Sequence, residues 1–153
     1  MQYWLMKSEP SVFSIDDLAR RPRRTDHWEG VRNYQARNFL RSMRKGDQVL
    51  FYHSSCAEPG VVGVAEIVRE AYPDSTAFDP ESAYYDPKSD PENPRWVMVD
   101  VRYRRKFAHT VTLKALKAQS RLRDMRLLQR GNRLSVMPVT KQQWSVIEKM
   151  AQA

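Results

Sequence analysis

Several aromatic residues of this sequence stand in polar surroundings, where a large ring has little apolar core to join. Trp28 lies between charged residues in DHWEG, just ahead of a helical stretch. Tyr52 and His53 end an apolar strand, and Tyr84 and Tyr85 occupy an acidic, proline-rich segment. Taken singly, each ring is more often structural than functional. Beside blocks of arginine, such rings are typical of proteins that stack an unpaired nucleic-acid base.

Polar side chains near these rings are candidates for reading the edge of a base. Hydroxyl and amide groups make such contacts, and by residue type the candidates are Ser8, Asn33, Ser54 and Ser135. Glu9 is a further candidate because a carboxylate accepts a hydrogen bond from the exocyclic amine of cytosine. Whether these residues converge depends on the fold.

Positive charge is concentrated in two blocks of the chain, which carries a net charge of +8. Residues 20–45 hold nine basic residues against two acidic ones, and residues 102–133 hold eleven against Asp124 alone. Residues 58–94, between them, hold nine acidic residues. This pattern favours a polyanionic partner, most often nucleic acid, over a merely solvated basic surface. The arginines expected on backbone phosphates are Arg20, Arg21, Arg23, Arg24, Arg37, Arg104 and Arg105.

Enzyme signatures are absent from the sequence. Its five glycines form no phosphate-binding loop or dinucleotide fingerprint, and neither GxSxG nor HExxH occurs. One cysteine excludes an internal disulfide, and with three scattered histidines it predicts no metal site and no cofactor. The alternative left open is an enzyme of nucleic-acid or nucleotide metabolism that uses His53, Cys56 or Glu9.

Hydrophobic patterns predict five strands among short helices, and hence a small α+β barrel. The expected strands cover 3–7, 48–53, 61–68, 96–107 and 134–139, and the helical stretches cover 14–21, 33–46, 112–119, 121–131 and 140–152. Capping boxes are predicted at Ser14 and Thr140, and a C-terminal cap at Gly46. Gly63 indicates a bulge or close backbone approach, and Pro138 an edge strand.

Residues 71–95 are the longest stretch without a regular pattern. They contain five of the nine prolines and almost no aliphatic side chains. Aromatic residues within them are unusual for a linker, so we predict an ordered excursion that forms a wall of a site.

The sequence predicts a single domain over residues 1–153. MQYWLMKSEP does not resemble a signal peptide, and no stretch approaches the roughly 18 apolar residues of a membrane helix. We therefore expect no membrane partner and a cytoplasmic protein, or a nuclear one in a eukaryote.

Six blocks of the sequence, in order, resemble the EVE domain. They are YWLMKSEP, the block from Trp28 to Asn38, GDQVLFYHS, GVVGVAEI, YYDPKS and PRWVMVDV. The resemblance covers nearly the whole chain and implies a PUA-like β-barrel wrapped by short helices, similar to the YTH domains that bind N6-methyladenosine in RNA. It implies that the chain is a non-catalytic reader of modified bases, and that its partner is DNA or RNA carrying such a base.

The resemblance also implies residue roles. Trp28 corresponds to a wall of the YTH aromatic cage, and Lys7, Ser8 and Glu9 to its floor. The second wall of that cage is a tryptophan in a region where this chain has Tyr84 and Tyr85, which leaves the second wall open. The expected ligand contacts are Lys7, Ser8, Glu9, Trp28, Arg32, Asn33, Tyr52, His53, Ser54, Tyr85 and Ser135.

Overall fold

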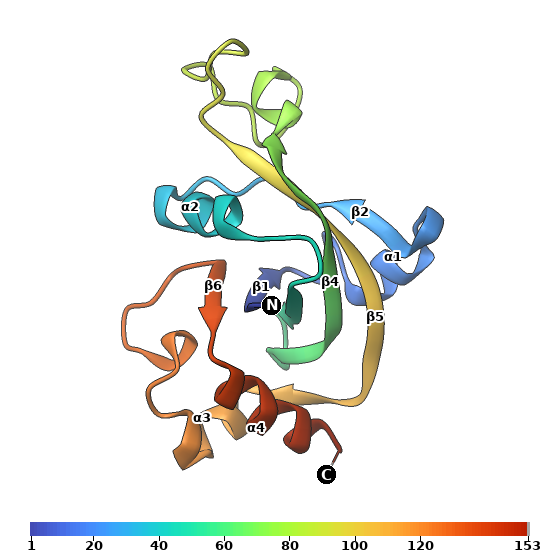
Figure 1. Cartoon of the computed structure of the whole chain (residues 1–153), viewed down its shortest axis with the longest axis vertical. Helices are drawn as coiled ribbons and strands as arrows, with labels where there is room; N and C mark the ends of the chain where they lie inside the picture. Colours follow the sequence, from blue (N-terminus) through green and yellow to red (C-terminus); the bar gives the residue numbers. More distant parts are fainter. Residues whose placement is uncertain (153) are drawn as a thin grey trace.

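The computed structural model describes residues 1–152, which form a mixed six-stranded sheet with four α-helices (Figure 1). The strands are β1 (Tyr3–Ser8), β2 (Thr25–His27), β3 (Gln48–His53), β4 (Gly60–Pro73), β5 (Val97–Thr112) and β6 (Val136–Val139). Their order across the sheet is β2-β5-β4-β3-β1-β6. β1 runs parallel to β3, and every other described pair is antiparallel.

The helices lie around this sheet, with α1 beside β5, and α3 and α4 together at the other end of the molecule (Figure 1). Their bounds are α1 (Ile15–Arg20), α2 (Tyr34–Ser42), α3 (Leu113–Ala118) and α4 (Lys141–Gln152). Four short 3₁₀ turns cover Pro22–Arg24, Ser75–Phe78, Ser120–Leu122 and Arg126–Leu128. The last two replace the helical stretch expected over 121–131.

Both predicted capping boxes are confirmed. The Ser14 hydroxyl accepts from the Asp17 N–H, and the Asp17 carboxylate accepts from the Ser14 N–H. Thr140 and Gln143 make the same reciprocal pair ahead of α4. Each box satisfies two N–H groups that a helix start would otherwise leave unpaired.

The core includes the neighbouring strands β1 and β3. They bury Leu5, Met6, Leu50 and Phe51 completely. Such near-continuous apolar runs are typical of strands covered on both faces. The core therefore fixes the ends of β1 and β3, where the candidate polar residues begin.

The expected α+β class is confirmed, and three details of the fold differ from the expectation. The sheet has six strands, because the three-residue β2 is too short to give an alternating pattern. Within residues 1–152 no pairing joins β2 to β6, so the sheet is not a closed barrel. Helix α2 ends at Ser42, and the N–H of its C-cap residue Met43 donates to the Leu40 carbonyl, whereas Gly46 (φ +94°) belongs to the turn before β3.

Two single-residue predictions are confirmed. Gly63 lies at a register shift between β4 and β5, and a Cβ there would collide with the Arg105 carbonyl and the Ile15 side chain. Pro138 lies in β6, the edge strand next to β1. A proline at an edge removes no interior ladder hydrogen bond.

Residues 71–95 form the ordered excursion that the sequence predicts, at the top of Figure 1. Its three Asp-Pro steps begin at Asp79, Asp86 and Asp90, and each aspartate accepts the N–H two residues further on. These are Asx turns, which give a segment local order without helix or strand.

None of the helices in residues 1–152 is long and apolar enough to cross a membrane. The same residues contain no cluster of three or more side chains suited to holding a metal ion.

Candidate nucleic-acid interface

The ends of three strands meet at one place in the sheet. The carboxyl ends of β1 and β3 coincide because the strands are parallel, and β6 starts beside the end of β1 because it is antiparallel. The Lys7 N–H donates to the Ser135 carbonyl at 2.8 Å, and the Ser54 N–H donates to the Ser8 carbonyl at 3.0 Å. Backbone pairing thus brings together segments that are distant in the sequence.

Trp28 lines the same cavity as these strand ends but comes from a different part of the sheet. It follows β2 directly, and its N–H donates to the Val99 carbonyl at 2.7 Å. Its ring meets Phe51 edge-on at 5.3 Å and Phe13 at 6.2 Å between centroids. Only 7% of the residue is exposed. Trp28 is therefore both a core residue and a wall of a cavity.

Tyr84 supplies a second aromatic ring from the excursion. It packs against Gly30, whose φ is +84° and where a Cβ would lie only 2.7 Å from the ring. Glycine at position 30 therefore allows both the left-handed turn and the close approach of the ring.

Together these segments enclose a cavity of about 540 Å³, which we call the Trp28 cavity. Such a volume is in the range of small-molecule sites, roughly 300–1,000 Å³. Its lining residues come from the strand ends, the turn after β2 and the excursion: Lys7, Ser8, Glu9, Val12, Phe13, Arg21, Asp26, His27, Trp28, Glu29, Gly30, Val31, Ser54, Ser55, Tyr84, Arg133 and Ser135.

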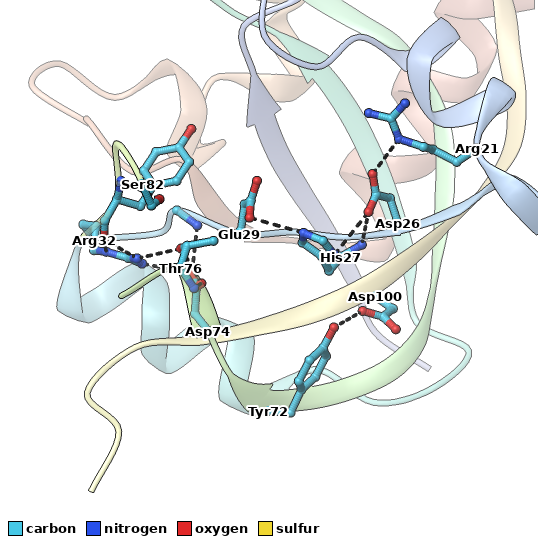
Figure 2. A network of polar contacts seen from close by, with 12 residues as sticks. Arg21, Asp26, His27, Glu29, Arg32, Tyr72, Asp74, Thr76, Ser82 and Asp100 are labelled. Carbon is cyan, nitrogen blue, oxygen red and sulfur yellow. Dashed lines mark hydrogen bonds and ion pairs between the residues drawn. The ribbon is translucent and has the colours of Figure 1, made fainter. Parts of the chain in front are cut away.

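Asp74 ties the turn after Trp28 to the excursion (Figure 2). Its side chain is fully buried and accepts from the Gly30 N–H at 2.9 Å and from Arg32 Nη1 at 3.0 Å. Arg32 also donates to the Tyr84 carbonyl at 2.7 Å. Burial alone would raise the pKa of Asp74, but hydrogen bonds from Thr76, Gly30 and Arg32 hold that pKa below its usual value. This clamp ties the Tyr84 backbone to the turn that follows Trp28.

A chain of polar contacts lies along the rim of the cavity (Figure 2). Arg21 Nε donates to Asp26 at 2.8 Å, and the His27 ring lies 3.3 Å from Asp26 and 3.2 Å from Glu29. The carboxylates on this rim are therefore engaged with neighbouring side chains.

Two cations of the cavity have no such partner. Within residues 1–152, neither Lys7 nor Arg133 has a carboxylate within 4.0 Å. Burial lowers the pKa of Lys7, whose Nζ lies 5.7 Å from the centroid of the Tyr52 ring. An anionic ligand in the cavity would give both Lys7 and Arg133 a partner of opposite charge.

The structure brings six of the eleven expected ligand contacts to the Trp28 cavity: Lys7, Ser8, Glu9, Trp28, Ser54 and Ser135. The Ser8 hydroxyl donates to the Phe13 carbonyl at 2.6 Å, which leaves its oxygen free to accept. The remaining five side chains lie outside the lining.

Each of those five has another structural role or position. Arg32 belongs to the Asp74 clamp, and the Asn33 side chain caps α2 by accepting from the Ala36 N–H. Tyr52 is buried, and the His53 ring accepts from the Ile15 N–H at 3.1 Å. Tyr85 is 42% exposed, and its neighbour Tyr84 lines the cavity instead.

The arginines expected on phosphates fall into distinct groups. Arg104 pairs with Glu66 at 3.4 Å and Arg105 pairs with Glu148, so both are already engaged. Arg21 lines the Trp28 cavity, and Arg20 lies 3.9 Å from Asp17. The exposed Arg23 and Arg24 have no carboxylate within 4.0 Å in the described chain, and Arg37 belongs to α2, where its guanidinium lies over the Tyr34 ring.

The residues of the enzyme alternative are not gathered at the cavity. Of His53, Cys56 and Glu9, only Glu9 lines it. The Nε2 of His53 accepts from the Ile15 N–H, so it is not free to serve as a base.

Sequence reasoning left the second wall open between Tyr84 and Tyr85 and chose Tyr85 as the ligand contact, whereas Tyr84 lines the cavity; it missed Arg133 as a cation of the lining. Gly30 is a further signal of a close neighbour, because a glycine between charged residues indicates a special backbone conformation or a close approach. Arg133 stood in a basic block with nothing to distinguish it from the other ten cations there.

Comparison with known proteins gives a consistent family. The EVE domain matches residues 2–150. Thymocyte nuclear protein 1 of Gallus gallus is 45% identical over 162 residues, which cover 95% of this chain and 66% of that protein. This chain thus spans slightly less than two thirds of that relative.

Two solved structures have nearly the same fold. An X-ray structure of a Pseudomonas putida protein is 53% identical, with a TM-score of 0.94 over 97% of this chain and 99% of that one. The human THYN1 protein, solved in complex with 5-methylcytosine-containing DNA, is 42% identical, with a TM-score of 0.95 over 100% and 99% of the two chains.

Proposed function

The chain belongs to the EVE domain family, and on this premise we propose that it is a non-catalytic reader of modified nucleobases. Its partner is nucleic acid that carries a modified base, with 5-methylcytosine in DNA as the first candidate. That candidate comes from the human relative, which was solved with such DNA. We further propose that the chain acts as a single EVE domain and works where nucleic acid is found, in the cytoplasm or in a eukaryotic nucleus.

The observation that carries the proposal is the Trp28 cavity. It combines aromatic rings from two separate segments with hydroxyl groups at converging strand ends and cations without a partner. A base needs this combination, because its faces stack on rings while its edge and phosphates require polar and positive groups.

A base inside a duplex cannot reach such a cavity, so it must be unpaired or flipped. Flipping costs a few kcal/mol, and least when the base is already single-stranded. Stacking on Trp28 and Tyr84 offsets part of this cost for every base. Discrimination must therefore come from the added group and from the edge.

The expected discrimination can be bounded from the lining. A methyl group buried against the rings contributes about 0.8 kcal/mol, a factor near four. A hydrogen bond gained or lost at Ser8, Ser54 or Ser135 contributes about 0.5–1.5 kcal/mol, and one at the Glu9 carboxylate contributes more. A preference of roughly 4- to 50-fold for the modified base follows from these two contributions.

The proposal is tested by titrating matched oligonucleotides with the protein. Single-stranded and duplex forms should carry cytosine, 5-methylcytosine, 5-hydroxymethylcytosine, adenine or N6-methyladenine, in DNA and in RNA. We expect saturable binding with one modified base preferred. Mass spectrometry of the recovered oligonucleotide should show it unchanged, because a reader releases its ligand intact.

Equal affinity for all these oligonucleotides, with saturation confirmed, would contradict a modified-base reader and leave a general polyanion binder. A product of altered mass would contradict the non-catalytic assignment.

A further inference from the structure

A second hollow, away from the Trp28 cavity, lies between α2 and the end of the excursion. It has a volume of about 340 Å³, and we call it the α2 groove. Its charged lining consists of Arg37 and Arg41 from α2, and of Lys88, Asp90 and Arg95 from the excursion. Four cations thus face a single carboxylate.

Two of these cations are held in place by the fold. Arg37 Nη1 donates to the Arg95 carbonyl at 3.2 Å, and its guanidinium lies 4.8 Å from the centroid of Tyr34. Arg95 donates to Asp86 at 3.4 Å and to the Lys88 carbonyl at 3.3 Å. Arg37 and Arg95 are therefore positioned before any ligand binds.

The other two cations are uncompensated. In the part of the chain that the structure describes, neither Arg41 nor Lys88 has a carboxylate within 4.0 Å. Burial, together with the positive charges of Arg41 and Arg95, lowers the pKa of Arg37. Like charges brought together repel one another, and an anion placed among them removes that repulsion.

We propose that the α2 groove binds the phosphodiester backbone of the nucleic acid whose modified base enters the Trp28 cavity. This inference rests on the proposed function and adds a second contact surface to it. A backbone phosphate carries one negative charge and accepts hydrogen bonds from arginine and lysine, which is the chemistry that the groove presents.

A continuous stack of side chains joins the two sites. Arg32 lies 5.8 Å from the Tyr84 ring and 5.5 Å from the Trp96 ring. Trp96 in turn stacks on Tyr34 at 5.0 Å, and Tyr34 lies under Arg37. Two arginines and three rings thus form one stack, which fixes the α2 groove relative to the Tyr84 wall.

The two sites are also close enough for one strand. Tyr84 lines the cavity and Lys88 lines the groove. Four residues of chain span at most about 14 Å, while successive nucleotides of a duplex strand rise about 3.4 Å. Lys88 at the groove therefore lies within the span of about four nucleotides of the Tyr84 wall.

Three arginines of β5 do not offer the same surface. Arg102 and Arg104 both contact Glu66, and Arg105 contacts Glu148. A phosphate at these positions would have to displace a carboxylate first. Compared with them, the α2 groove has an excess of positive charge, with four cations against one carboxylate in its lining.

The test compares two variants that remove the same charge. Arg41→Gln with Lys88→Gln empties the groove of its uncompensated cations. Lys114→Gln with Lys117→Gln, on exposed positions of α3, is the control with the same net charge. Oligonucleotides with cytosine or 5-methylcytosine are titrated from 0.05 to 0.5 M salt, and melting curves confirm that both variants fold.

For the groove variant, we expect the slope of log affinity against log salt to flatten by roughly 1.4–1.8, which is two contacts at about 0.7–0.9 each. If the two proteins have equal affinity at 1 M salt, this slope difference corresponds at 0.05 M salt to a loss of affinity of roughly 60- to 200-fold. The loss should be equal for both oligonucleotides, because a phosphate contact reports nothing about the base. The α3 variant should keep nearly the wild-type slope.

A groove variant that matches the α3 variant would overturn the inference, even if wild-type protein prefers 5-methylcytosine. Equal wild-type affinity for both oligonucleotides, with the groove slope still flattened, would instead contradict the modified-base reader alone.

Discussion

Replacing Gly30 by alanine is expected to displace the Tyr84 wall of the Trp28 cavity. The new Cβ would lie 2.7 Å from two carbons of the Tyr84 ring, Cε1 and Cζ. Non-bonded carbons settle at about 3.5–4.0 Å, so the ring must retreat by roughly 1 Å. Alanine at φ +84° also costs about 1–2 kcal/mol of folding free energy, because its Cβ approaches the following carbonyl.

Gly46→Ala separates these two effects. Gly46 has a φ of +94°, but a Cβ there meets no atom within 4 Å. Both variants should therefore lose about 1–2 kcal/mol of unfolding free energy. Only Gly30→Ala should lose base affinity, by up to the 1–3 kcal/mol typical of stacking one base on a ring, or roughly 5- to 150-fold.

The assay combines thermal unfolding with titration of an oligonucleotide that carries 5-methylcytosine. Tyr84→Ala serves as a second variant, since it removes the ring without straining the backbone at Gly30. Equal affinities for Gly30→Ala, Gly46→Ala and the wild type, with Tyr84→Ala also unaffected, would refute the role of Tyr84 as a wall.

Two further variants probe the same region of the fold. Trp28→Ala should cost about 3–5 kcal/mol of stability, because the residue is 7% exposed and its ring packs on Phe51 and Phe13. At a temperature where the variant is folded, it should also lose base affinity. Undiminished affinity would contradict the role of Trp28 as a wall of the cavity. Burial lowers the pKa of His53, whose Nε2 accepts from the Ile15 N–H, so the unfolded state binds a proton more readily. The melting temperature should therefore fall as pH drops below about 6.5, and less so in His53→Gln; equal pH profiles for the two proteins would contradict this role.

The sequence predicted the parts of the site that depend on strands and helix starts. Four of the lining residues lie at or next to the ends of apolar strands: Lys7, Ser8, Ser54 and Ser135. The family resemblance placed Trp28 and the β1 end together. Their convergence required the parallel pairing of β1 with β3 and the antiparallel pairing with β6. Strand direction in a sheet is set by tertiary packing, which a local pattern does not contain.

The sequence did not predict which member of a neighbouring pair faces the cavity. Tyr84 and Tyr85 are adjacent in a segment with no helical or strand period, so nothing local indicates which ring points inward. The expected phosphate contacts of Arg104 and Arg105 are disfavoured for a related reason, because their carboxylate partners Glu66 and Glu148 lie on other elements. Register shifts between β4 and β5 made the first pairing unpredictable from spacing.

Asn33 could have been assigned correctly from the sequence. An asparagine directly ahead of a helical stretch is a preferred N-cap, and its side chain does cap α2. Its place in the Trp28–Asn38 block that resembles the EVE domain favoured a ligand role, whereas the side chain lies outside the Trp28 cavity. A local energetic role therefore deserves to be considered before a binding role for any capping residue type.

The acidic block at residues 58–94 initially opposes a polyanionic partner, and the structure removes much of that conflict. Asp74 is buried against Arg32 and the Gly30 N–H, and Asp86 accepts from Trp96 Nε1 and pairs with Arg95. These carboxylates hold the excursion in shape and are matched by cations. The acidic residues thus position the Tyr84 wall and one side of the α2 groove, while the uncompensated charge beside a bound strand stays positive. An acidic segment and a nucleic-acid partner are compatible when the carboxylates face inward.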